Sequence, residues 1–92
     1  MNLLDRVTKE LMDIIIAIGP KFRDIDKNEI IELCKHDEQE IAFEVLCSQI
    51  GEFDIPISRE IFERIEKLCI ELNVDQVYVD SIHGLIINGD KK

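Results

Sequence analysis

The sequence predicts an all-α fold, a small antiparallel helical bundle of four to five helices that ends in a short extended C-terminal segment. Apolar residues recur at helical spacing in four segments, and residues that favour helix starts precede them. The chain is 46% hydrophobic but only 5% aromatic, which indicates an aliphatic core between packed helices. Its 92 residues suit a single domain over 1–92.

The first and fourth predicted helices have the clearest signals. Residues 3–18 place six apolar residues on one side, after Asn2 as a cap and before Gly19 as a stop. The members of this stripe are Leu4, Val7, Leu11, Ile14, Ile15 and Ile18. Residues 59–72 follow Ser58 as a cap, and Asn73 suits a left-handed residue at their end.

Two further helices are predicted over residues 27–35 and 38–50. Asp26 and Asp37 stand at their N-cap positions, and each is followed by Glu three residues later, as in a capping box. Gly51 is predicted to end the second of them.

The chain after residue 73 gives a weaker pattern. A short helical turn capped by Asp75 is favoured, although Val77 and Val79 alternate with polar residues as in a strand. Residues 85–87 suit a brief extended segment, and residues 89–92 suit a frayed tail.

The charge balance excludes several kinds of ligand. Twenty acidic residues against eleven basic ones give a net charge of −9, which disfavours direct binding to nucleic acid or to an anionic membrane. The negative net charge favours a basic partner, and the alternative interpretation is that it only keeps the protein soluble. Three cysteines without a CxxC spacing indicate core packing in a reducing compartment. No signal-like N-terminus is present, so a cytoplasmic location is expected.

The residues that could carry chemistry are few. Neither His36 nor His83 is placed beside a nucleophile, and the sequence has no phosphate-binding loop or metalloprotease motif. Asp37 and Glu40 next to His36 offer metal-ligating atoms, but their capping positions already account for them. We therefore expect no enzyme activity, no metal and no cofactor.

The distribution of charge is more informative than its total. Residues 36–58 contain six acids and no Lys or Arg, and residues 68–90 contain four more acids and again no base. If these stretches are neighbours in the fold, they form a face of one sign that attracts a basic protein. Otherwise the segregation exists in the sequence alone.

Residues 36–46 and 49–58 resemble the MafI-type family of bacterial immunity proteins, which accompany polymorphic and contact-dependent inhibition toxins. The similarity covers residues 30–73 and lies in an acidic helix start, an Ala-x-Glu-x-Leu-like segment, an acidic aromatic connector and a Ser-led helix. Gln39 departs from the family pattern. The resemblance implies a cytosolic protein that binds the C-terminal nuclease domain of a cognate toxin and covers its basic active-site cleft. Such toxin domains are commonly RNases, and an EndoU-like fold is one of the options.

The resemblance and the charge pattern together suggest eight residues for toxin binding. They are Asp37, Glu40, Glu44, Glu52, Asp54, Asp75, Tyr78 and Asp80. Capping is the stronger interpretation for Asp37 and Glu40, and Tyr78 suits either a rigid anchor or a core position. The alternative function is an acidic adaptor, or a nucleic-acid mimic, that docks another basic protein.

Overall fold

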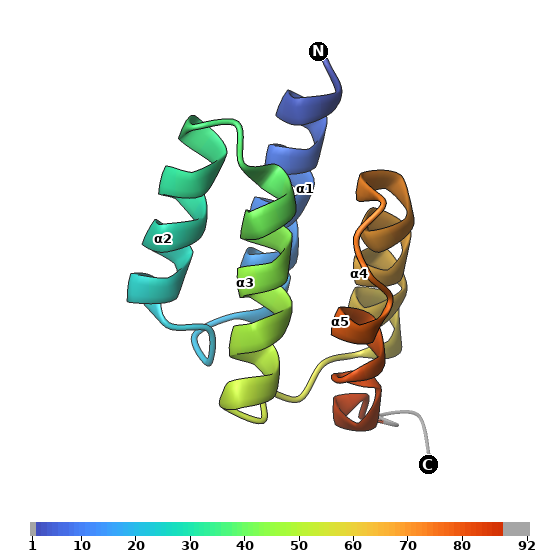
Figure 1. Ribbon diagram of the computed structural model, residues 1–92. Coiled ribbons are helices and arrows are strands. Elements are labelled where there is room, and N and C mark those ends of the chain that lie inside the picture. The colour runs from blue at the N-terminus through green and yellow to red at the C-terminus, as the bar shows by residue number, and fades with distance from the viewer. Residues whose placement is uncertain (1, 88–92) are drawn as a thin grey trace.

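The computed structural model describes residues 2–87, and regular structure in that range consists of helices (Figure 1). The elements are α1 (Leu3–Ile18), α2 (Asp24–Lys35), α3 (Gln39–Glu52), α4 (Arg59–Leu72), α5 (Val77–Asp80) and a 3₁₀ turn at His83–Leu85. Each long helix runs opposite to the one before it. The predicted all-α bundle is confirmed. Within the described range, no helix combines the length and apolarity that crossing a membrane requires.

Helix α3 is the centre of the bundle, because it packs against α1, α2, α4 and α5. Phe43, Leu46 and Ile50 on its inner side are fully buried. Val45 lies outside that stripe and also packs against the core from a partly buried position. Helix α3 therefore contacts neighbouring helices on more than one of its sides.

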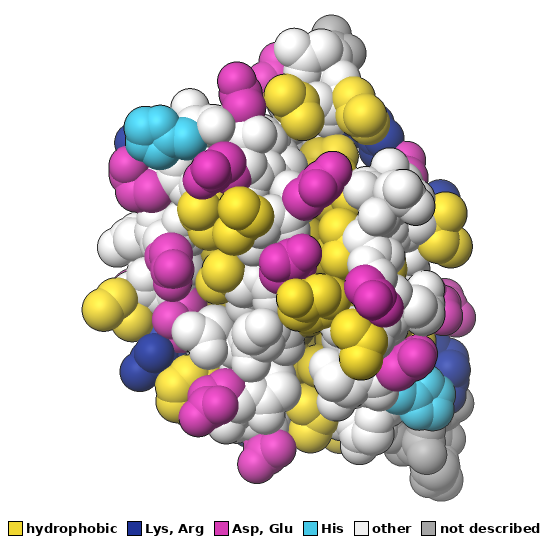
Figure 2. Space-filling view, in the orientation of Figure 1, with side chains coloured by type: hydrophobic (Ala, Val, Ile, Leu, Met, Phe, Trp, Pro, Cys, Tyr) yellow, Lys and Arg dark blue, Asp and Glu magenta, His cyan; other side chains and the backbone are white. Residues whose placement is uncertain are grey.

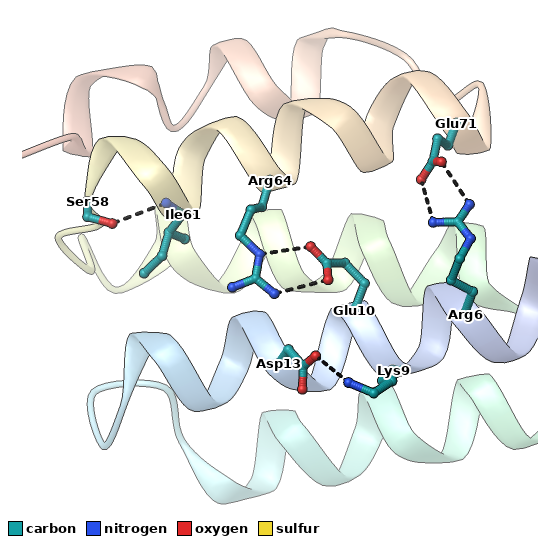
Figure 3. Close-up of polar contacts among 8 residues, drawn as sticks. All are labelled: Arg6, Lys9, Glu10, Asp13, Ser58, Ile61, Arg64 and Glu71. Atoms are coloured by element: carbon teal, nitrogen blue, oxygen red, sulfur yellow. Dashed lines mark hydrogen bonds and ion pairs between the residues drawn. The ribbon is translucent and has the colours of Figure 1, made fainter.

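The boundaries of α1 and α4 are those predicted, because local hydrogen bonds set them. The Asn2 Oδ1 accepts a hydrogen bond from the Asp5 backbone N–H at 2.8 Å. The Ser58 Oγ accepts one from the Ile61 N–H at 3.1 Å (Figure 3). One member of the predicted α1 stripe is misplaced, since Leu4 is 37% exposed.

Helix α2 begins three residues earlier than predicted, and Asp26 is not its cap. Asp26 lies inside the first turn and is 4% exposed. Its carboxylate accepts hydrogen bonds from the Arg23 Nε at 2.9 Å and from the Gln49 Nε2 at 3.0 Å. The Arg23 guanidinium also lies 4.3 Å from the centre of the Phe53 ring. The Asp26 carboxylate is therefore engaged by Arg23 and Gln49 and does not cap the helix.

Asp37 ends α2 instead of capping α3, which corrects another prediction. Its φ of 59° is left-handed. Its N–H donates to the Cys34 carbonyl at 3.1 Å, and the Glu38 N–H donates to the Leu33 carbonyl at 2.9 Å. This pair of bonds is a Schellman motif. Glu38 takes the N-cap position of α3 without a side-chain capping bond.

The ends of α3 and α4 repeat this geometry. Asp54, with a φ of 48°, and Asn73, with a φ of 57°, hold the same left-handed position after their helices. The Ile55 N–H donates to the Ile50 carbonyl at 3.0 Å, which completes the motif after α3. The prediction for Asn73 is confirmed, whereas Gly51 lies inside α3 and does not end it.

The chain after α4 folds back on the connector that precedes it. Residues 77–80 form α5, so the helical prediction is right and the strand alternative is wrong. The predicted cap is wrong, because Gln76 holds the N-cap position, although Asp75 Oδ1 accepts a hydrogen bond from the Val77 N–H at 3.0 Å. Ile57 and Ile86 form an isolated parallel bridge, in which the Ile87 N–H donates to the Ile57 carbonyl at 2.9 Å. The predicted extended segment begins one residue later than expected, because Leu85 belongs to the 3₁₀ turn, and Ile86 and Ile87 hold the C-terminal region against the connector. The predicted tail at 89–92 lies outside the described residues.

Two ion pairs join α1 to α4 along one side of the bundle (Figure 3). The Arg64 guanidinium donates to both Glu10 carboxylate oxygens, at 2.8 and 3.0 Å. Arg6 contacts Glu71 at 2.7 Å. Both pairs are bidentate, so they fix the relative register of the two helices.

The Glu10–Arg64 pair predicts a pH dependence of stability. The hydrogen bond from Arg64 lowers the pKa of Glu10 below its ordinary 4.5. A lowered folded-state pKa stabilises the protein above the ordinary value, and the contribution is lost as pH falls through the lower one. Because the pair is about one-third exposed, we expect Glu10→Gln to reduce the free energy of unfolding by about 0.5–1 kcal/mol near neutral pH. Urea denaturation near pH 3 should give a smaller difference, and an equal difference at both pH values would contradict the prediction.

Candidate protein-binding face

The two base-free stretches of the sequence are neighbours in the structure. Helix α3 belongs to the first stretch and α5 to the second, and the two helices pack against each other. Figure 2 shows carboxylates and apolar side chains interleaved over this part of the surface, with Lys and Arg toward the margins of the view. The segregation of charge in the sequence therefore becomes segregation in space over the described residues.

A first hollow lies where the start of α3 meets the ends of α1 and α4, and we call it the Gln39 hollow. Four acids line it, namely Asp37, Glu38, Glu40 and Glu71. The apolar residues of its lining are Leu3, Leu4, Ile41 and Leu72. Lys and Arg are absent from the lining.

A second hollow, the Tyr78 hollow, follows along α3 toward α5 and α2. Tyr78 lines it together with the acids Glu29 and Glu44, the apolar Ile41 and Val45, and the polar Ser48 and Gln49. Ile41 belongs to both hollows and is 46% exposed. The two hollows are therefore contiguous, and we call their combined lining the acidic face.

An acidic residue of this face shifts the pKa of Tyr78. The negative charge of Glu44, with a smaller effect of burial, raises the pKa of the Tyr78 phenol above its usual value. The phenol is protonated at neutral pH, as tyrosine ordinarily is, so its O–H is a hydrogen-bond donor. Its side chain is half-buried and packs against the edge of the core, which agrees with the core position that the sequence offered, whereas the anchor role stays a prediction.

The structure brings together half of the residues suggested for binding. Asp37 and Glu40 line the Gln39 hollow, and Glu44 and Tyr78 line the Tyr78 hollow. The remaining four, Glu52, Asp54, Asp75 and Asp80, line neither hollow.

The other four residues are exposed but lie away from the hollows. Glu52 is eight residues beyond Glu44, which corresponds to about 12 Å along a helix. Asp54 holds a left-handed backbone position and Asp75 hydrogen-bonds the start of α5, so local structure accounts for both. Asp80 is the last residue of α5.

The sequence did not single out several residues of this face. Glu29 was interpreted only as part of a cap, and Glu38 and Glu71 only as members of charge runs. Gln39 was noted only as a departure from a family pattern. Its spacing from Ala42 and Phe43, three and four residues later, was the available signal, because it places Gln39 on the buried side of α3.

The histidines and cysteines do not form a reactive pair in the described chain. His83 lies edge-on to the Phe62 ring with 5.4 Å between centroids. His36 follows the last residue of α2, at the C-cap position. Among residues 2–87, no three metal-ligating side chains of His, Cys, Asp or Glu lie close enough to hold an ion.

The cysteine thiols are expected to be unreactive in the folded protein. All three are buried, and burial raises the pKa of Cys34 and Cys69 and raises that of Cys47 to about 12. Because the thiolate is the reactive form, a disulfide reagent should modify the native protein at least about a hundredfold more slowly than the denatured protein. Absorbance of the released thiol with and without denaturant measures this, and a fast reaction of native Cys47 would contradict it.

Searches against models of protein families, curated proteins and solved structures find no match to this chain. The resemblance to MafI-type immunity proteins therefore stays a prediction, and the acidic face itself must support any statement about function.

Proposed function

We propose that this protein is a cytoplasmic immunity protein that binds the basic nuclease domain of a cognate toxin through the acidic face. The observation that carries the proposal is the lining of the two contiguous hollows. It contains six carboxylates and no Lys or Arg. A surface that serves solubility alone usually interleaves charges of both signs.

The composition of the face suits recognition of a nuclease cleft. A cleft that binds nucleic-acid phosphates presents Lys and Arg, and carboxylates form charge-assisted hydrogen bonds with the same groups. Ile41 and Tyr78 between the acids add apolar and aromatic area, which supplies much of the affinity of protein interfaces. Occupying the cleft would block the toxin sterically and electrostatically, so the immunity protein needs no catalytic group of its own.

The same face also suits the alternative function, in which the chain docks a different basic protein as an adaptor or nucleic-acid mimic. The two functions differ in the gene context. A toxin gene immediately beside this one supports the immunity function, and an isolated gene supports the adaptor.

Co-purification with the neighbouring gene product tests the proposed function. We expect a complex of nanomolar affinity whose association rate falls at least about tenfold when ionic strength rises from about 0.05 to 0.5 M, because screening weakens long-range attraction. The toxin domain's nuclease activity should fall in proportion to complex formed. Stopped-flow mixing measures the rate, and a salt-independent rate or an uninhibited nuclease would contradict the proposal.

A further inference from the structure

Gln39 is an unusual member of the acidic face because half of its amide lacks a partner. The residue is 3% exposed. Its Nε2 donates to the Thr8 Oγ1 at 3.1 Å and to the Cys34 carbonyl at 3.3 Å. Its Oε1 is buried and has no hydrogen-bond donor among residues 2–87. A buried acceptor left in this state costs free energy, so a donor supplied by a ligand gains more here than at an open surface.

Gln39 lines two neighbouring recesses of the surface. Thr8 and Cys34, the partners of the nitrogen, line a separate recess beside α1 and α2. Gln39 also lines the Gln39 hollow, which has a volume of about 410 Å³. Gln39 therefore lies in the wall between the two, and its oxygen is enclosed, so a donor that enters from the Gln39 hollow reaches it only when lining side chains move aside.

The charges of the hollow select a cation as that donor. Asp37, Glu38 and Glu40 form no ion pair with any described residue, whereas Arg6 neutralises Glu71. The apolar part of the lining is open to a partner, since Leu3 is 52% exposed. A suitable ligand therefore combines a positive charge, several N–H donors and an aliphatic stem.

We propose that the Gln39 hollow receives an arginine side chain of the partner protein, whose guanidinium donates to the Gln39 Oε1 and to the Glu40 carboxylate. The planar guanidinium has five N–H donors and is weakly hydrated, so it can serve an amide oxygen and a carboxylate together. The compact, strongly hydrated lysine ammonium suits a buried amide oxygen less well. The arginine methylenes would cover Leu3 and Leu4. The identity of the partner rests on the proposed function, but the chemistry of the hollow does not.

An NMR titration at low salt with N-acetyl-argininamide tests the hollow directly. The matched neutral probe is N-acetyl-citrullinamide, which has nearly the same shape without the charge. We expect saturable shifts of the Gln39 side-chain amide and the Ile41 backbone amide, and at least about tenfold weaker binding of the citrulline probe. Equal binding of the two probes, or arginine shifts confined to other surfaces, would overturn the proposal.

Three variants sharpen the test. Glu40→Gln removes an exposed charge, Gln39→Met removes the amide oxygen, and Thr8→Val removes only an acceptor of the amide nitrogen. We expect the first two to weaken binding of the arginine probe about tenfold and the third to change it less than about twofold. Thermal melting checks that each variant is folded. If Gln39→Met does not fold, Glu40→Gln decides, and unchanged affinity in that variant overturns the proposal.

Different results would contradict this proposal and the proposed function, because the arginine probe tests the hollow without the toxin. Binding of the arginine probe in the hollow, together with no binding of the toxin domain, would overturn only the proposed function. Tight toxin binding that Glu40→Gln leaves unchanged, together with no binding of the probe, would overturn only the assignment of this hollow.

Discussion

Reversing the charges of Glu40 and Glu44 together is expected to slow association with the proposed toxin partner about ten- to a hundredfold. Glu40 lies in the Gln39 hollow and Glu44 in the Tyr78 hollow, one helical turn apart on α3. Glu40→Lys with Glu44→Lys puts two positive charges where the partner is basic. Like charges at a contact also raise the dissociation rate, so the equilibrium affinity should fall further than the association rate.

A matched control separates the position of the charge from its amount. Glu60→Lys with Glu63→Lys makes the same change in net charge on α4, and both residues are exposed and line a different groove, which also contains Arg64 and Lys67. Glu40 and Glu60 each lie in the first turn of a helix, so both pairs of substitutions also lose one favourable interaction with a helix dipole. The two double variants should therefore have similar stability.

The outcome is read from stopped-flow association rates at one ionic strength. We expect the control to slow association less than about threefold, which is the effect of net charge acting from a distance. Equal slowing by the two double variants would mean that total charge and not the acidic face governs binding. An unchanged rate in Glu40→Lys with Glu44→Lys would place the interface elsewhere.

Sequence patterns located helices well where the signal is local. Asn2 and Ser58 each accept a backbone hydrogen bond three residues ahead, as a cap should, and α1 and α4 have the predicted bounds. Asp26 and Asp37 carry the same pattern of an acid followed by Glu, yet neither is a cap. The surroundings of the two residues explain this. The Asp26 carboxylate is hydrogen-bonded by the neighbouring Arg23 and by the distant Gln49, and the Asp37 backbone ends the preceding helix.

The sequence predicted that an acidic face exists, but not which residues form it. The base-free stretches indicated which segments supply it, since charge runs are visible without a structure. Which acids share a hollow depends on how α2 and α5 lie beside α3, and this placed Glu29 with Glu44 and left out Glu52. The spacing of residues within one helix does not predict which residues of different helices share a hollow, because packing between segments far apart in sequence sets those contacts.

Removing the Asp26 carboxylate is expected to cause the largest loss of stability among the polar substitutions. Its oxygens bind two residues on different elements, Arg23 before α2 and Gln49 on α3. Asp26→Ala leaves the Gln49 amide without this acceptor and opens a small cavity. We expect the free energy of unfolding to fall by about 2–3 kcal/mol, a large part of the roughly 5–15 kcal/mol typical of a domain. Urea denaturation measures the loss.

Asp24→Ala is the matched control, because Asp24 is also an acid in the first turn of α2 but its side chain is 93% exposed. Its one ion contact, to Lys27, is 3.9 Å long. The control should lose at most about 0.5–1 kcal/mol, the value of a carboxylate near a helix N-terminus. Equal losses in the two variants would mean that the buried hydrogen bonds add nothing beyond helix capping.

The Asp26 substitution also affects the acidic face, since Gln49, its hydrogen-bond partner, lines the Tyr78 hollow. The Asp26–Gln49 bond holds the first turn of α2 against α3, and Glu29 lies one turn further along α2 in the same hollow. Loosening this end of α2 should let Glu29 move away from Glu44. Asp26→Ala is therefore expected to weaken toxin binding modestly even where the protein is fully folded, whereas Asp24→Ala is not. Binding measured well below the melting temperature of both variants separates this effect from unfolding.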